Sequence, residues 1–414
     1  MRRAAANPRK KRKWLRFSLR SLLILIALFA ILFAVIGGDI GKAYRQARDM
    51  KYLQEEGFQI VEYSQPSQYE EMLLWFLPRE GVLSPKEGRY GLKGANTEML
   101  EIISRQTSWE DLRLVVDPAD RDILRRRIQN WRGLEGLSID NALGGDALPS
   151  LANHQDLYSL SISVEGCDAS VYTSIAAAPA LEYIHLGSVF DEGLVNVLEM
   201  PTLRELALSG QNFTSAPFVA ARTSSIEKLY VPVTKFDNQA LKAVLKWPRL
   251  KHLIVGDTLI TDEVFAEIPL QDKQRLETLS WRNGPITSAA IPGIAEFSSL
   301  VTLGLSNTKI TDENLELLNQ MPALEELNLM YCQLTDAGVS KLRNPSITKL
   351  WLSDTQITVA ALENLDQRFP ALQACGIEWC KITAAEVETL RAKFPTVSFN
   401  DLPAKQPLPF EWDE

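Results

Sequence analysis

The strongest constraint on the fold is an apolar pattern, leucine-x-x-leucine-x-leucine, that recurs along most of the chain. A period of two dozen residues is typical of solenoids, in which each repeat packs only on its neighbours. We expect a degenerate first copy at Trp109 and a terminal copy at Val397. The copies between them begin at Leu134, Leu157, Leu181, Leu203, Ile226, Leu250, Leu276, Leu300, Leu324, Ile347 and Leu372.

Each copy carries the signals of a strand, a turn and a short helix. The two later apolar positions, such as Leu303 and Leu305, alternate as in a strand with one buried face. A turn residue follows, at Thr234, Thr258, Thr308, Cys332, Thr355 and Cys380, and then an apolar residue and a helix-capping threonine. Thr383 has Glu386 three residues on, which predicts a capping box.

The helical face is predicted from positions four and seven after the capping threonine or its equivalent. In the last six repeats these positions are all apolar, namely Phe265, Ile268, Ile291, Ile294, Leu315, Leu318, Val339, Leu342, Leu362, Leu365, Val387 and Leu390. A single repeat cannot bury such a face by itself. We therefore expect stacked repeats with one continuous core.

The N-terminus predicts a membrane anchor. Residues 21–38 contain no charge, and an 18-residue helix spans roughly 27 Å, close to the ~30 Å hydrocarbon core. Residues 1–20 hold nine basic side chains and no acid, so the positive-inside rule places them in the cytoplasm and the repeats on the extracytoplasmic side, periplasmic or at the cell surface. Two alternatives stay open: a cleaved signal peptide with a poor site at 34–38, and a nuclear import patch at 8–13.

The segments on either side of the repeats are interpreted as accessory. We expect residues 39–108 to form a juxtamembrane stalk and N-terminal cap, with a short strand at 58–63 and a loop at Gly88, Gly91 and Gly94. Residues 109–399 are the predicted solenoid. The proline-rich acidic tail, residues 400–414, is either an extended partner-binding strand or a disordered end.

In the last six repeats the motifs Cys332-Gln-Leu-Thr-Asp-Ala-Gly338-Val and Thr308-Lys-Ile-Thr-Asp-Glu-Asn314-Leu resemble the cysteine-containing, ribonuclease-inhibitor-like class of leucine-rich repeat. With the basic arm and the single span, the chain resembles a large bacterial family of membrane-anchored leucine-rich-repeat proteins. The resemblance implies an α/β horseshoe with parallel strands on its concave face and short helices on its convex face. It also implies protein binding. The copies at Leu157 and Leu181 depart from the pattern, since they lack the threonine.

Charge and motif content argue against several functions. Beyond residue 38, the 35 basic residues left after the nine of the arm face 52 acidic ones, a balance of −17 that disfavours nucleic-acid binding. No HExxH, GxSxG, P-loop or dinucleotide fingerprint is present. We expect Asp262, Asp312 and Asp336 to complement helix N-termini. We thus expect no enzyme, no cofactor, no metal and no small-molecule substrate.

The four cysteines are expected to be free thiols. Cys332 and Cys380 occupy equivalent turn positions two repeats apart, roughly 10 Å at the spacing of strands, which is too far for a disulfide. Cys375 replaces a core leucine, and Trp281 does the same in an earlier repeat. We interpret these residues as packing.

Candidate binding residues lie on the strands near the C-terminal end: Trp351, Tyr331, Trp379, Met330, Glu326, Asn328, Lys349 and Asp354. Trp351 has Asn328 and Gly376 as neighbours in the adjacent repeats, so we expect its ring to project from the surface. The alternative is a ring lying flat over Gly376. Exposed aromatics among polar residues are typical of interface anchors.

The sequence therefore predicts a membrane-tethered module that binds a protein partner on the concave face of a solenoid. A self-associating structural component of the cell envelope is the alternative. A polysaccharide binder and an enzyme with an unrecognised site are further alternatives.

Overall fold

The repeats form one continuous parallel sheet. The computed structural model describes residues 59–60, 89–95, 111–116, 121–128, 130–131, 133–139, 148–210, 212–231 and 235–399. Strands in these ranges make a fifteen-stranded sheet in chain order, with β1 antiparallel to β2 and every later pair parallel. The strands are β1 (Gln59–Ile60), β2 (Arg89–Ala95), β3 (Asp111–Val116), β4 (Gly136–Ile139), β5 (Ser159–Ser163), β6 (Tyr183–Gly187), β7 (Glu205–Leu208), β8 (Lys228–Val231), β9 (His252–Gly256), β10 (Thr278–Arg282), β11 (Thr302–Ser306), β12 (Glu326–Asn328), β13 (Lys349–Trp351), β14 (Ala374–Gly376) and β15 (Ser398–Phe399).

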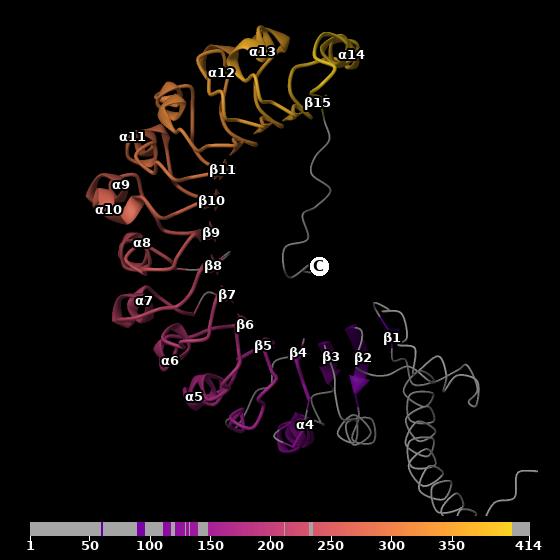
Figure 1. The fold of residues 1–414 in the computed structure, drawn as a ribbon, viewed down its shortest axis with the longest axis vertical. Coiled ribbons are helices and arrows are strands. Elements are labelled where there is room, and N and C mark those ends of the chain that lie inside the picture. Colours follow the sequence, from indigo (N-terminus) through magenta and orange to yellow (C-terminus); the bar gives the residue numbers. More distant parts are fainter. Residues whose placement is uncertain are drawn as a thin grey trace, which may run out of the picture.

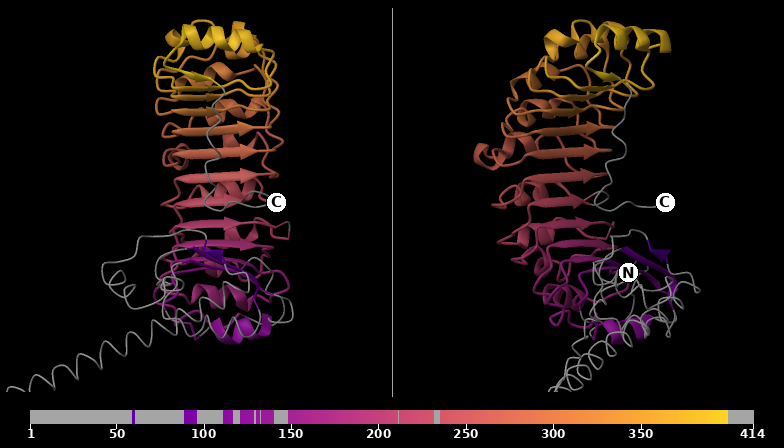
Figure 2. Two further views of the ribbon diagram at one scale, coloured as in Figure 1. Left: turned by 90° about the vertical axis from the view of Figure 1, so that its right-hand side faces the viewer. Right: turned by 45° about the vertical axis from the view of Figure 1, so that its right-hand side comes forward.

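Short helices return the chain from one strand to the next, and Figure 1 shows them on the outside of an arc whose inner side is the sheet. Those described are α4 (Arg121–Ile128), α5 (Ser170–Ala176), α6 (Val195–Leu198), α7 (Ala216–Ala220), α8 (Asn238–Val244), α9 (Val264–Glu267), α10 (Leu270–Lys273), α11 (Ile291–Ile294), α12 (Asp336–Val339), α13 (Leu365–Arg368), α14 (Ala384–Lys393) and the 3₁₀ turns η2 (Ser288–Ala290), η3 (Leu315–Gln320) and η4 (Val359–Leu362). The strands run side by side along the whole arc (Figure 2). The predicted horseshoe is confirmed.

The core lies between the sheet and the helices because the repeat places equivalent apolar residues in register. Leu303 pairs with Leu327, and Leu327 with Leu350, each fully buried. Trp281 and Cys375 continue the apolar rows, both at 0% exposure, so their interpretation as packing is confirmed. The twelve predicted helix-face residues, from Phe265 to Leu390, are all buried as well.

Several local expectations are corrected. Gly91 and Gly94 belong to β2, which pairs with β3, because three glycines at this spacing do not prevent an extended conformation. Phe399 pairs with Cys375, so in the terminal copy the core residue follows Val397 by two positions and not by the three that the pattern predicts. The copies at Leu157 and Leu181 carry helices α5 and α6 although they lack the threonine.

The degenerate first copy is confirmed, since Leu112 pairs with Leu137 and Leu114 with Ile139. The predicted span at 21–38 and the tail at 400–414 lie outside the described residues. Among the helices that the structure does describe, none has the length and apolar character needed to cross a bilayer.

Polar side chains connect several successive coils on the convex side. The Asp312 carboxylate accepts hydrogen bonds from the Thr335 N–H (2.8 Å) and from the Thr335 hydroxyl, one repeat later. Asp262 holds Thr287 in the same way, and Asp336 holds Thr358. From the sequence we expected these carboxylates only to complement helix N-termini. The structure shows that each also fixes the capping threonine of the following repeat.

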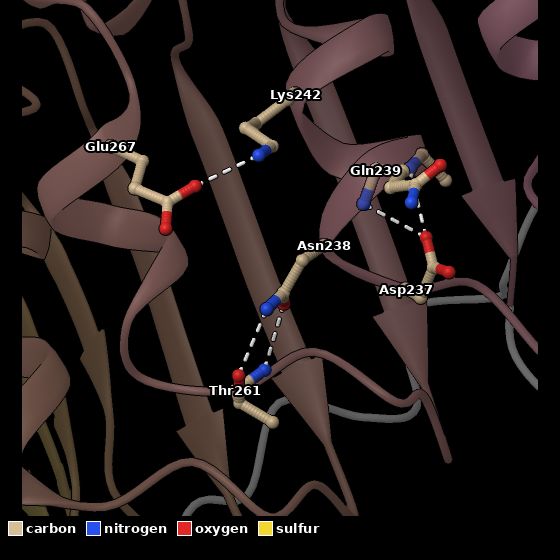
Figure 3. A network of polar contacts seen from close by, with 7 residues as sticks. Asp237, Asn238, Gln239, Lys242, Thr261 and Glu267 are labelled. Carbon is tan, nitrogen blue, oxygen red and sulfur yellow. Dashed lines mark hydrogen bonds and ion pairs between the residues drawn. The ribbon is translucent and has the colours of Figure 1, made fainter.

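The same connection is made by an amide where asparagine replaces the aspartate. Asn238 accepts from the Thr261 N–H and donates to the Thr261 hydroxyl, both at 2.9 Å (Figure 3). Beside it, Lys242 forms an ion pair with Glu267 at 2.8 Å, again between successive repeats. At Val359 the chain offers no such acceptor, and Glu386 binds the N–H and hydroxyl of Thr383 in the predicted capping box.

Gly338, in the motif Leu334-Thr335-Asp336-Ala337-Gly338, leaves room for this carboxylate. A Cβ added to Gly338 would collide with the Asp312 carboxylate, which approaches from the preceding repeat. The glycine and the aspartate of the motif therefore serve one contact between repeats.

Asp312→Ala removes two acceptors from Thr335 and leaves its N–H without its partner. We expect the free energy of unfolding to fall by about 1–3 kcal/mol. Chemical denaturation followed by circular dichroism measures the change. Asp366→Ala, an exposed aspartate on α13, is the matched control and should shift the value by no more than about 0.5 kcal/mol. Equal effects of the two substitutions would contradict the role given to Asp312.

Candidate protein-binding surface

A row of turn residues runs along the edge where the strands end. Each member is the seventh residue after the first leucine of its repeat and has a left-handed backbone: Ser188, Gly210, Asp257, Asn283, Asn307, Tyr331, Asp354 and Trp379. We call this set the turn row. The conformation lets the backbone leave the strand and turn toward the convex side.

Backbone hydrogen bonds place members of the turn row on successive coils side by side. The Tyr331 N–H donates to the Ser353 carbonyl at 3.0 Å, and the Asp354 N–H to the Glu378 carbonyl at 2.7 Å. Asn283 and Asn307 are also joined through their side chains, since the Asn307 amide donates to Asn283 at 2.7 Å. Among the described members up to Asn307, the side chains are small and polar, except at Gly210, which has none.

Tyr331 and Trp379 do not fit the pattern of the row. Left-handed backbone is tolerated by glycine, asparagine and aspartate, and is uncommon for a bulky residue. Here φ is 59° at Tyr331 and 56° at Trp379, and the side chains are 44% and 70% exposed. Neither residue type favours a left-handed backbone, and neither ring is buried. We call Tyr331, Asp354 and Trp379 the aromatic edge.

The expectation that the ring of Trp351 projects from the surface is wrong. Its side chain is only 3% exposed and lies over Gly376, where an added Cβ would be 2.6 Å from the ring atom Cε3. The indole N–H donates to the Glu326 carboxylate at 2.8 Å. The bare glycine surface next to it offers enough contact area for the ring to lie flat, and this overrides projection into solvent.

The other predicted residues differ in whether their side chains are paired, partly buried or exposed. Glu326 forms an ion pair with Lys349 at 3.4 Å, and Asn328 accepts the Met330 N–H at 3.0 Å, so these side chains have partners within the sheet. Met330 itself is half-buried. Asp354 is exposed, and within the described residues its carboxylate has no hydrogen bond or ion pair.

The sequence analysis did not recognise the turn row or the two aromatic residues that depart from its pattern. Asn or Asp at Asp257, Asn283, Asn307 and Asp354 is a signal for left-handed backbone, and it recurs at one position of the repeat. Tyr331 and Trp379 break that signal in the sequence itself. Aligning the repeats on this position would have identified the two aromatics independently of any guess about exposure.

The opposite end of the concave face carries a histidine of unusual environment. His185 on β6 is 6% exposed, and its Nδ1 lies 2.9 Å from the Ser161 hydroxyl on β5. Burial lowers the pKa of His185 to about 4. The imidazole is therefore neutral at physiological pH. The nearby rings of Tyr158 and Tyr183 meet edge to face at 6.1 Å.

The thiols are embedded in the fold. The thiols of Cys332 and Cys380, two repeats apart, donate to the carbonyls of Leu305 and Leu352, and none of the four cysteines forms a disulfide. Burial raises the pKa of Cys375 to about 12, so this thiol is unreactive at neutral pH. Among the side chains that the structure describes, no three His, Cys, Asp or Glu residues are placed to hold a metal ion.

The parallel sheet, the repeat period and the buried leucine rows define a leucine-rich-repeat solenoid. Residues 320–342 match a family model described as a leucine-rich repeat, which covers the repeat that contains Tyr331. No curated protein matches the sequence.

Among solved structures, an internalin of Listeria monocytogenes is similar, with 16% identity, a TM-score of 0.45, and coverage of 81% of this chain and 94% of that one. A leucine-rich-repeat protein of Leptospira interrogans is also similar, with 18% identity, a TM-score of 0.35, and coverage of 75% and 93%. At these identities and scores the two proteins say nothing of what this chain binds.

Trp379→Asn places at the left-handed turn the residue that the chain itself uses at positions 283 and 307. We expect the free energy of unfolding to rise by about 0.5 kcal/mol, because relief of the backbone exceeds the small loss of packing around a mostly exposed ring. Denaturant titration measures it. Tyr183→Asn, on a regular strand, is the control and should lower stability. A loss above about 1 kcal/mol in Trp379→Asn would show that its ring is structural.

His185→Gln should reduce the loss of stability in acid. The unfolded histidine takes up a proton below its ordinary pKa of about 6.5, whereas the folded one resists until about pH 4. The unfolded state therefore binds more protons than the folded state as pH falls through this window. Proton uptake by this histidine lowers the free energy of unfolding by about 3 kcal/mol. The free energy of unfolding, measured at pH 7 and pH 4, should fall less in the variant by roughly that amount. An identical pH dependence of the two proteins would refute the lowered pKa.

Proposed function

We propose that the chain is a membrane-tethered protein-binding module that performs no catalysis. Residues 21–38 anchor it, the repeats lie on the extracytoplasmic side, and they belong to the cysteine-containing class. The fold supports the binding role, because a solenoid presents a long curved surface whose exposed positions are free to vary.

The observation that carries the proposal is the aromatic edge. Tyr331 and Trp379 keep large apolar rings in solvent at backbone positions that disfavour them. Unfavourable backbone conformations are concentrated at functional sites, and Tyr and Trp are the side chains most enriched among interface hot spots. The partner therefore docks over the edge of the sheet at which β12, β13 and β14 end. The rest of the concave face contacts the margins of the partner.

Cross-linking in intact membranes tests this proposal. A benzophenone amino acid replaces Tyr331, which preserves an aromatic ring, and in a matched variant it replaces Val219, which is 54% exposed on the convex helix α7. On illumination we expect position 331 to give an adduct with a protein of defined mass, and position 219 to give none.

The nature of the adduct decides among the alternatives. An adduct of twice the mass of the chain would replace the proposal by self-association in the envelope. An adduct that glycosidases remove would identify a polysaccharide. Equal labelling from positions 331 and 219, or no labelling, would overturn the docking surface.

A further inference from the structure

Some carboxylates on the sheet are paired with a cation on the neighbouring strand, and others are not. Glu205 pairs with Lys228 at 2.9 Å and Glu326 pairs with Lys349, so each of these acids has a cation in the neighbouring strand. Asp354 has no such partner among the described residues, and neither does Glu378, the residue before Trp379. Two acids without a cation thus lie beside two exposed rings.

The spacing of the rings is set by the sheet. Tyr331, Asp354 and Trp379 occupy three successive coils joined by backbone hydrogen bonds. Neighbouring strands lie about 4.8 Å apart, so the two aromatic positions are roughly 10 Å apart with the aspartate between them. These are separations of backbone positions, and a cation bound between the two side chains must lie within ~6 Å of each ring centroid to be attracted by both.

We propose that the aromatic edge binds an arginine side chain from a basic segment of the partner, an inference that rests on the proposed function. The planar guanidinium stacks between Tyr331 and Trp379 and forms an ion pair with Asp354. Arginine fits better than lysine, because its planar, weakly hydrated group stacks on rings and meets a carboxylate with two N–H donors.

Charge complementarity favours this occupant over a neutral one. A sugar ring also stacks on aromatics, but it leaves the charge of Asp354 and Glu378 without a counterpart. The excess of acidic residues beyond residue 38 attracts a basic segment over a longer range. On the other side, the Asn283–Asn307 pair ends the site, since those side chains satisfy each other.

The experiment titrates the full chain in detergent micelles with an acetylated (Gly-Arg)4 peptide amide, followed by calorimetry. A peptide with citrulline in place of arginine has the same shape without the charge and is the ligand control. We expect the citrulline peptide to bind at least tenfold more weakly. Affinity for the arginine peptide should fall at least fivefold in Trp379→Asn and in Asp354→Asn.

Two charge variants control for general attraction to an acidic protein. Asp366→Asn removes an exposed acid from α13, and it should leave affinity within twofold of the parent. Lys381→Gln removes an exposed cation two residues after Trp379, and it should leave affinity equal or tighter. Equal losses in Asp366→Asn and Asp354→Asn would overturn the site, because attraction would then be diffuse. Equal binding of the two peptides would overturn the choice of arginine.

The outcomes separate this inference from the docking proposal. If position 331 cross-links to a protein while Trp379→Asn and Asp354→Asn leave affinity for the arginine peptide unchanged, the docking surface stands and arginine recognition falls. If position 331 yields no adduct and the peptide results hold, the edge binds guanidinium groups but the proposed partner protein falls. A stability of Trp379→Asn equal to or above that of the parent, measured separately, would show that its loss of binding is not a loss of folding.

Discussion

The structure depends on the in-register pairing of equivalent residues in successive coils. Leu303, Leu327 and Leu350 lie side by side because each repeat returns the chain to the same point of the next strand. No single coil has an interior of its own, and burial arises only between coils. The Asp312–Thr335 contact and its equivalents add a polar connection at the outer side. Register is thus fixed from both sides of the coil.

Fixed register makes the position within the repeat the main determinant of each residue's environment. The seventh position after the first leucine is a left-handed turn in every described repeat from Leu181 onward. A residue there contributes little to the core, so its identity follows backbone preference unless something else selects it. Asn283 and Asn307 follow that preference, whereas Tyr331 and Trp379 do not. Because all four residues have the same left-handed backbone, the aromatic side chains at Tyr331 and Trp379 indicate selection by something other than backbone preference.

Apolar periodicity allowed the core to be predicted residue by residue, including the substitutions Trp281 and Cys375, because burial in a solenoid follows from position alone. The capping box at Thr383 was also predictable, since all its atoms lie within one turn. The orientation of Trp351 was not, because it depends on the space above Gly376 and on Glu326 one strand away. Such lateral contacts join residues more than twenty positions apart and leave no local signal.

Exposed positions are of two kinds, those on the flat part of the sheet and those in the turn row. This difference explains why only three of the eight residues predicted from the sequence remain in the candidate surface. On the flat part of the sheet, a large side chain finds neighbours on both sides, so Trp351 is buried and Glu326 is paired. At the turn row the backbone curves away, and the neighbours of Trp379 cannot cover its ring. An aromatic residue on the sheet can therefore be explained by packing, whereas one at the turn cannot. The residues least useful to the stability of this fold are the ones that best indicate where it binds.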